Sequence, residues 1–353
     1  MSQADGDARR LLSVEGLKKH FPIEKGLFRR TVGQVRAVDG VSFAVQKGET
    51  LGLVGESGCG KTTTGRMIAG LYEPTAGRVV FHADGQNMDV WSLTHLEMLE
   101  FRRGVQIVFQ DPFSSLNPWM RVTEIVGEPL IVQRGMKGKE LRREVGRLLE
   151  VVGLRSQYAD RFPHEFSGGQ RQRIGIARAL APGPRLVVAD EPVSALDVSV
   201  QAQILNLLID LQVRFELSYL FIAHDLSVVR YISDRVAVMY LGKIVETGEA
   251  EDVFRHPRHP YTEALLSALP EMDPTAEEDR IVLRGDVPSP ANPPPGCPFH
   301  PRCRYAEDRC KADPPELVEL SAGHATACLR AQELDLQGRP FAAGGHEPPP
   351  NGA

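Results

Sequence analysis

Short apolar runs, separated by longer amphipathic stretches, mark out most of this chain. Apolar and largely β-branched residues occupy positions 51–54, 186–189, 219–222 and 235–239. Runs of this length and composition are typical of strands buried on both faces of a parallel sheet, with helices in the stretches between them. The pattern therefore predicts an α/β fold in which helices cover the faces of a mostly parallel sheet.

An amphipathic helix is predicted within an inserted, mainly helical segment that spans about residues 94–184. Five apolar residues recur at helical spacing along one side of it: Leu141, Val145, Leu148, Leu149 and Val152. Arg and Glu occupy the opposite side, so we interpret this stripe as core packing.

The residues after the first apolar run fit the phosphate-loop pattern G-x-x-x-x-G-K-[ST] at every fixed position. They read Gly55-Glu56-Ser57-Gly58-Cys59-Gly60-Lys61-Thr62. The glycines let backbone N–H groups turn inward around phosphates, and the helix that follows directs its positive end at the same charge. Lys61 is expected to reach the β- and γ-phosphates and Thr62 to ligate Mg²⁺, with Thr63 as a weaker candidate. The loop therefore predicts a nucleotide site.

The apolar run at 186–189 ends in two carboxylates. Asp190 is predicted to hold Mg²⁺ through water. Glu191 follows directly and points to the other side of the extended chain, where it is predicted to orient or deprotonate the attacking water.

A glycine-rich run lies between the phosphate loop and this acidic pair, and it indicates a second phosphate site. It reads Phe166-Ser167-Gly168-Gly169-Gln170-Arg171-Gln172-Arg173. Ser167 is predicted to cap a helix whose exposed N–H groups form a second phosphate site without a lysine. Such a site suits a phosphate held by another chain, which predicts a dimer with ATP at its interface.

These motifs together resemble the ATP-binding subunits of ABC transporters, in which the Ser-Gly-Gly-Gln signature of one subunit closes on ATP held by its partner. The resemblance implies a P-loop NTPase (RecA-like) core with an inserted α-helical subdomain and a small cysteine-containing C-terminal domain. It assigns Gln110 to Mg²⁺ and the attacking water, and His224 to the γ-phosphate and the catalytic carboxylate. Asp197 falls in the loop that crosses the dimer seam. Phe21 is the best candidate to stack on adenine, with His20 as the alternative and burial of Phe21 in an N-terminal sheet as the other interpretation.

The last part of the chain distinguishes a branch of this family. Residues 256–266 resemble the start of the C-terminal region in the dipeptide/oligopeptide/nickel uptake branch. We divide the chain into an ABC ATP-binding domain at 11–254, an oligopeptide-transporter-type domain at 255–330 and a tail at 331–353. The tail is expected to be disordered, and its part from Gly338 to Ala353 is rich in Pro and Gly.

Four of the five cysteines lie in the predicted C-terminal domain, and the fifth is Cys59: the four are Cys297, Cys303, Cys310 and Cys328. Their spacing of C-x5-C-x6-C-x17-C does not match the usual zinc pairs. Some members of the branch carry an iron–sulfur cluster on cysteines of similar spacing, so a [4Fe-4S] cluster is expected. Zn²⁺, with His300 or His324 as substitute ligands, and four metal-free thiols are the alternatives.

The charge and hydropathy of the chain limit the classes of partner and the location that we expect for it. A formal charge of −5 and a pI near 6.1 are not typical of a nucleic-acid-binding protein, and mean hydropathy is −0.21. The sequence has no apolar run long enough for a membrane span, and its first residues do not resemble a secretory signal. We therefore expect a peripheral subunit on the cytoplasmic face of the inner membrane.

The resemblance also implies a function and an assembly. The chain is expected to hydrolyse ATP and to power an importer of peptides or a related small solute. Its partners are two transmembrane permease subunits, a second and non-identical ATP-binding subunit and, indirectly, an extracytoplasmic solute-binding protein. The alternative is a soluble ABC-type ATPase acting on ribosomes or DNA, but the tandem cassettes or coiled-coil insertions typical of that class are not found in the sequence.

Overall fold

The computed structural model describes residues 9–26, 30–83, 85–269 and 280–339. These residues form two compact units, each built from several stretches of the chain. The described part of the first unit comprises 9–20, 38–50, 61–83 and 85–223. The described part of the second comprises 21–26, 30–37, 51–60, 224–269 and 280–339.

Three parallel strands form the centre of the first unit. They pair in the order β6 (Val105–Val108), β7 (Leu186–Asp190) and β8 (Ser218–Ala223). Every residue of β7 and β8 is buried, which explains why these strands read as unbroken apolar runs. Helix α2 (Lys61–Ile68) packs against β7 and β8, and α7 (Val198–Phe215) follows β7 along the chain.

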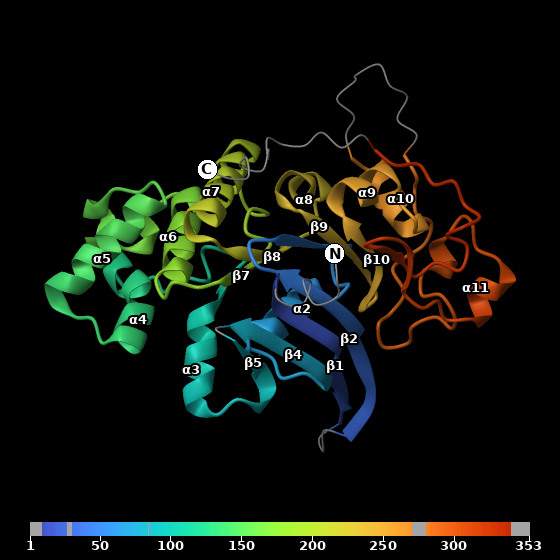
Figure 1. Cartoon of the computed structure of the whole chain (residues 1–353), viewed down its shortest axis with the longest axis horizontal. Helices are drawn as coiled ribbons and strands as arrows, with labels where there is room; N and C mark the ends of the chain where they lie inside the picture. Colours follow the sequence, from blue (N-terminus) through green and yellow to red (C-terminus); the bar gives the residue numbers. More distant parts are fainter. Residues whose placement is uncertain (1–8, 27–29, 84, 270–279, 340–353) are drawn as a thin grey trace. The chain divides into compact units, whose positions relative to one another are not determined.

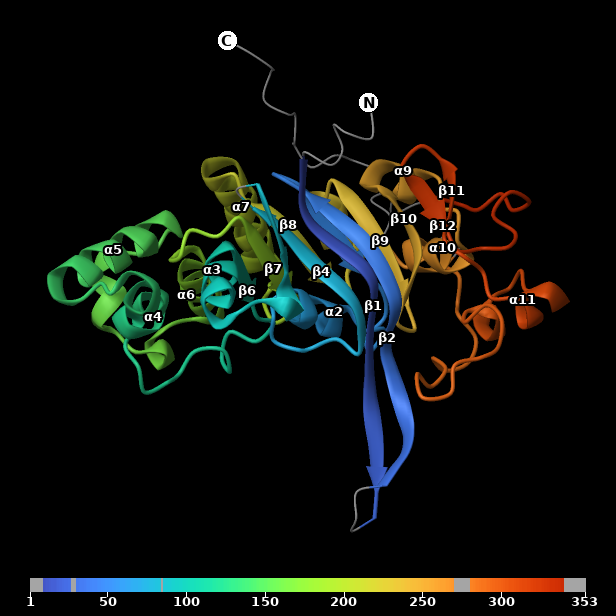
Figure 2. The ribbon, with the colours of Figure 1, turned by 60° about the horizontal axis from the view of Figure 1, so that its bottom comes forward.

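A second, antiparallel sheet has the strand order β2-β1-β4-β5. Its strands are β1 (Arg10–Lys25), β2 (Arg30–Gln46), β4 (Ala76–Ala83) and β5 (Gln86–Asp89). Strands β1 and β2 run side by side as a long ribbon (Figure 2).

Helices dominate the stretch between β5 and β7 (Figure 1). They are η1 (Val90–Ser92), α3 (His95–Gly104), α4 (Val122–Arg134), α5 (Gly138–Val151), η2 (Ser156–Asp160), η3 (Pro163–Glu165) and α6 (Gly168–Leu180). The apolar stripe predicted for α5 is confirmed as core, because its residues are all buried. The prediction of a mainly helical segment was wrong at β6, because Val105, Gln106, Ile107 and Val108 pair in parallel with β7.

The second unit is built on strands in the order β3-β9-β10-β12-β11. The bounds are β3 (Thr50–Val54), β9 (Arg235–Tyr240), β10 (Lys243–Glu249), β11 (Val318–Ser321) and β12 (His324–Thr326). Only β3 and β9 pair in parallel, and the other pairs are antiparallel. Its helices are α8 (Leu226–Ile232), α9 (Ala250–Arg255), α10 (Pro260–Ser267), η4 (His300–Arg302) and α11 (Asp308–Ala312).

The α/β class predicted from the sequence is confirmed, since the four predicted apolar strands correspond to β3, β7, β8 and β9. Parallel pairing is found within each unit, between β3 and β9 and among β6, β7 and β8. Among the residues that the structure describes, no helix has the length and apolarity needed to cross a membrane.

Candidate functional site

The predicted phosphate loop connects β3 to α2, and two of its glycines meet other backbone closely. A Cβ on Gly55, where φ is 151°, would lie 2.1 Å from the carbonyl oxygen of Met239. A Cβ on Gly60, where φ is 108°, would lie 2.1 Å from the carbonyl oxygen of Ala37. Both positions therefore require glycine for steric as well as conformational reasons.

The other loop residues differ in exposure. Ser57 and Gly58 are exposed, whereas Cys59 is buried and its carbonyl accepts a 2.9 Å hydrogen bond from the Gly242 N–H. Glu56 is partly buried and binds two residues of the C-terminal region, which are described below. The loop backbone is thus tied to the β9–β10 turn of the same unit.

The start of α2 and the end of β7 bring together the predicted Mg²⁺ ligands. The Thr62 hydroxyl donates a 2.9 Å hydrogen bond to Oδ1 of Asp190, which is only 2% exposed. Burial raises the pKa of Asp190, while the Thr62 hydrogen bond and the charges of Arg66 and Lys61 lower it. Lys61 is itself only 4% exposed, and Thr63 is partly buried beside it. Hydroxyl and carboxylate oxygens are the donors that Mg²⁺ prefers, so this pair fits the ion.

The two predicted residues for water activation meet in the same unit. The Gln110 side-chain amide donates a 2.8 Å hydrogen bond to Oε2 of Glu191. Glu191 has a left-handed backbone, with φ at 48°, and its N–H donates to the carbonyl of Ile222 at 2.9 Å. A non-glycine residue in this conformation costs about 1–3 kcal/mol and is typical of functional positions. The chain is therefore not extended at Glu191, in contrast to the sequence-based prediction.

The predicted signature forms a capped helix start, as expected. The Ser167 hydroxyl accepts from the Gln170 N–H at 3.4 Å, and the Gln170 side chain accepts from the Ser167 N–H at 3.1 Å. A Cβ on Gly169 would lie 2.5 Å from a methyl group of Val200 in α7, and one on Gly168 would also contact the segment before α7. Asp197 is exposed and is the N-cap residue of α7.

Besides the loop residues 55–60, the second unit contains two further predicted site residues, His224 and Phe21. His224 directly follows β8 and is exposed. Phe21 lies in β1 and is partly buried rather than enclosed in the sheet. His20, the alternative to Phe21, places Nε2 3.2 Å from Oδ1 of Asp39. The contacts of His224 and Phe21 with a nucleotide stay predictions.

The prediction of an iron–sulfur cluster was wrong. The four cysteines do line one small cavity of about 20 Å³, together with His259 and His300. Within the described residues, however, no three His, Cys, Asp or Glu side chains form a group that could hold a metal ion. The same finding leaves the Zn²⁺ alternative without support.

Burial affects three of the four thiols. It raises the pKa of Cys297, and it raises the pKa of Cys303 to about 11 and that of Cys328 to about 12. The sequence pattern alone carried no information about this burial.

Two residues that contact the loop were missed at the sequence level. Arg302 forms an ion pair with Glu56, and the Tyr261 hydroxyl accepts a hydrogen bond from the Glu56 N–H. Tyr261 falls in the run that resembles the C-terminal region of the peptide-uptake branch, but nothing in that run points to the loop. Arg302 carries no local signal, because its partner is 246 residues away.

Comparison with known proteins agrees with the motifs and their arrangement. Residues 38–194 match the family model described as ABC transporter, and residues 245–310 match the model described as oligopeptide/dipeptide transporter, C-terminal region. The oligopeptide transport ATP-binding protein AppF of Bacillus subtilis is 53% identical over 90% of this chain and 96% of its own. The dipeptide transport ATP-binding protein DppF of Haemophilus influenzae is 51% identical, over 90% of this chain and 96% of its own.

Solved structures give the same result. The ATP-binding cassette MJ0796, in a dimeric post-hydrolysis state with ADP and Pi, matches with a TM-score of 0.58 and 29% identity, over 68% of this chain and 99% of its own. The cbiO1 subunit of Clostridium perfringens matches with a TM-score of 0.58 and 27% identity, over 70% and 91%. The chain belongs to the ATP-binding proteins of ABC transporters, in the oligopeptide/dipeptide branch of that family.

Proposed function

We propose that this chain is the ATP-hydrolysing subunit that powers an ABC importer of peptides or a related small solute. The observation that carries the catalytic part is the hydrogen bond between Gln110 and Glu191, next to the hydrogen bond between Thr62 and the buried Asp190. Its relatives are named as oligopeptide and dipeptide transport ATP-binding proteins, which supports the peptide assignment. They also favour transport over action on ribosomes or DNA.

The roles of the site residues follow from their chemistry. Lys61 and the loop N–H groups would bind the ATP phosphates, and Thr62 and Asp190 would hold Mg²⁺. The ion supplies positive charge to the phosphate oxygens. Glu191 would take the proton of the attacking water, while the amide of Gln110 orients the carboxylate. His224 would contact the γ-phosphate.

The assembly follows from the signature helix. Ser167 and the glycines after it would complete the site of a second ATP-binding subunit, which we take to be a non-identical paralogue. ATP would then hold the pair together, and hydrolysis would release it. Two permease subunits would place the chain on the cytoplasmic face of the inner membrane, and a solute-binding protein would act on the far side. The division at residues 254 and 330 stays a prediction, and residues 340–353 of the predicted tail lie outside the described residues.

Affinity purification tests this function. The Glu191→Gln chain is purified with ATP from detergent-solubilised membranes, and mass spectrometry identifies the proteins that accompany it. Two multi-span permeases and a second ATP-binding protein are expected, and Lys61→Ala serves as the control that lacks the ATP-dependent partner. Recovery only from the soluble fraction, with ribosomal or DNA-bound proteins, would contradict the transport function.

A further inference from the structure

The phosphate-loop carboxylate Glu56 is held by an arginine from the C-terminal region. Arg302 Nη1 lies 2.6 Å from Glu56 Oε2, and Nη2 lies 3.0 Å from Oε1. The Arg302 side chain is 6% exposed and that of Glu56 is 27% exposed. Paired contacts of this kind fix the angle of both groups as well as their separation. The ion pair therefore sets the orientation of the Glu56 side chain.

A tyrosine of the same region holds the backbone of the same loop residue. The Tyr261 hydroxyl accepts a 2.8 Å hydrogen bond from the Glu56 N–H. Tyr261 is fully buried in the first turn of α10, with ring centroids 4.7 Å from Tyr240 and 5.3 Å from Phe299. Burial raises the pKa of Tyr261, so the hydroxyl stays protonated and neutral. The aromatic cluster holds Tyr261 in place, and Tyr261 in turn fixes the position of the loop backbone at Glu56.

The position of Glu56 gives these contacts a consequence for nucleotide binding. It is the second residue of a loop whose predicted ligand is a polyphosphate, and a free carboxylate there would repel the ligand. Arg302 neutralises this charge without competing for the phosphates, because both of its terminal nitrogens already contact Glu56. Loss of Arg302 would leave a partly buried carboxylate unpaired, which is the costly case.

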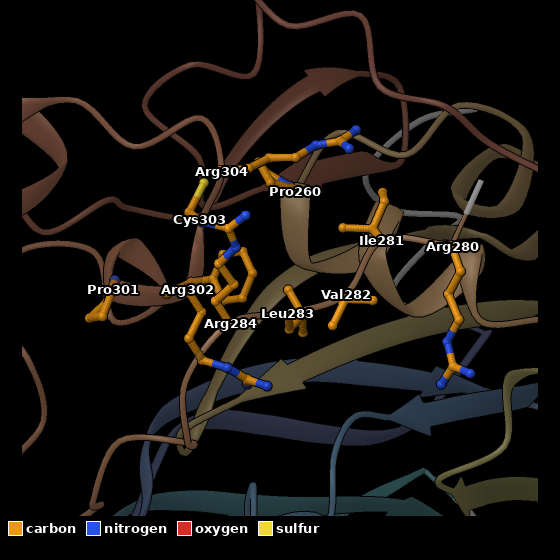
Figure 3. A pocket seen from close by; sticks show the side chains of 11 residues that line it. Pro260, Arg280, Ile281, Val282, Leu283, Arg284, Pro301, Arg302, Cys303 and Arg304 are labelled. Atoms are coloured by element: carbon orange, nitrogen blue, oxygen red, sulfur yellow. The ribbon is translucent and has the colours of Figure 1, made fainter.

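Other arginines lie near Arg302, but no contact between them and Glu56 is found among the described residues. It lines a cavity of about 630 Å³ whose wall also contains Arg280, Arg284 and Arg304 (Figure 3). Arg304 pairs with Glu263 inside the C-terminal region. Arg284 lines the same cavity and is exposed, so it offers a control with the same chemistry at the same wall.

We propose that the C-terminal region positions the phosphate loop for ATP binding, with Arg302 and Tyr261 as positioning residues that act through Glu56. The inference rests on the proposed ATP-binding function. It adds that the C-terminal region holds the phosphate loop in position. It gives the region matched by the second family model a role in the nucleotide site, beyond its resemblance to other transporters.

The test is a charge-rescue experiment on the full chain. ATP affinity is measured by fluorescence titration with trinitrophenyl-ATP, and KM and kcat by phosphate release. Arg302→Met is expected to weaken binding and raise KM by about tenfold, with kcat at saturating ATP changed less than about twofold. Adding Glu56→Gln to the same chain removes the unpaired charge and is expected to restore affinity to within about threefold of the starting value.

Control variants separate the possible outcomes. Arg284→Met is expected to leave KM unchanged. Tyr261→Phe, which removes only the acceptor of the Glu56 N–H, is expected to weaken binding about threefold and tests the inference even where Arg302→Met does not fold. Unchanged affinity in both Arg302→Met and Tyr261→Phe would overturn the proposal, as would a loss in Arg302→Met that Glu56→Gln does not restore. A starting chain that does not bind ATP would instead refute the proposed function.

Discussion

We predict that His259 makes the C-terminal region sensitive to acid. Its side chain is 1% exposed, and burial lowers its pKa to about 3. Nδ1 accepts a 3.1 Å hydrogen bond from the Tyr261 N–H, which requires a lone pair on that nitrogen. The neutral ring thereby caps α10, the helix that carries Tyr261. Protonation would remove the acceptor and bury a charge next to Phe299, whose ring lies 5.7 Å away.

The size of the effect follows from the two pKa values. An unfolded histidine has a pKa of about 6.5, so between about pH 6.5 and pH 3 the unfolded chain binds a proton that the folded chain does not. Stability is therefore fully present above the unfolded value and falls as the pH is lowered. Between pH 7.5 and pH 5.0 the loss from His259 alone is about 2 kcal/mol.

Native-state hydrogen exchange of α10 (Pro260–Ser267) measures this loss locally, which matters because a chain with two compact units need not unfold in one step. His259→Asn is the matched control, since asparagine keeps an acceptor at the N-cap and does not titrate. The opening free energy of α10 should fall by about 2 kcal/mol more in the natural chain than in the variant.

Two neighbouring groups lie close to His259. The carboxylate of Glu246 accepts from the backbone N–H of His259 at 3.0 Å and lies 2.8 Å from Nε2 of His324. Both groups are present in the natural chain and in His259→Asn, so the difference between the two proteins reports the His259 ring together with its coupling to these neighbours. The same pH dependence in both proteins would refute the assignment of a neutral, buried His259.

Three further predictions concern the nucleotide site. Glu191→Gln should keep ATP binding but lower phosphate release by at least about 100-fold, and near-normal turnover would remove Glu191 as the base. Gly60→Ala should abolish tight ATP binding in a nucleotide titration, because the new methyl meets the Ala37 carbonyl at 2.1 Å. Gly58→Ala has nothing within 4 Å and should cost only about 1–2 kcal/mol, so equal effects of the two variants would contradict the steric argument. Ser167→Asp keeps the helix cap and should leave thermal stability within about 0.5 kcal/mol. It also places a negative charge where a phosphate is predicted, so phosphate release should fall at least about tenfold, and full activity would exclude that contact.

Local sequence patterns predicted the parts of the fold that depend on local chemistry. Strands β7 and β8 could be predicted from the sequence because they are buried on both faces. Such burial permits only apolar residues along most of their length. The cap at Ser167 could be predicted from the sequence because a hydroxyl and a glutamine three residues apart each accept a hydrogen bond from the other residue's backbone N–H. In both cases the residues that determine the structure are neighbours in the chain.

Contacts between distant residues were predictable only where separate motifs assign both residues to one ligand. Thr62 and Asp190 are 128 residues apart, and their association was expected because each was assigned to the same Mg²⁺. Glu56 and Arg302 are 246 residues apart, and no periodicity, cap or turn relates them. The cysteines show the opposite error, since a spacing pattern suggested a metal although the side chains do not form a metal-binding group in the described part of the chain.

The contacts that serve hydrolysis and those that hold the loop come from different stretches of the chain. The bonds from Gln110 to Glu191 and from Thr62 to Asp190 lie within the first compact unit. The partners of Glu56 lie within the second. A change at Glu191 removes a group needed in the transition state, which lowers kcat, whereas a change at the partners of Glu56 alters ground-state binding, which raises KM. A C-terminal region that acts on ATP affinity alone can adjust how readily the cassette loads nucleotide while leaving the hydrolytic step intact.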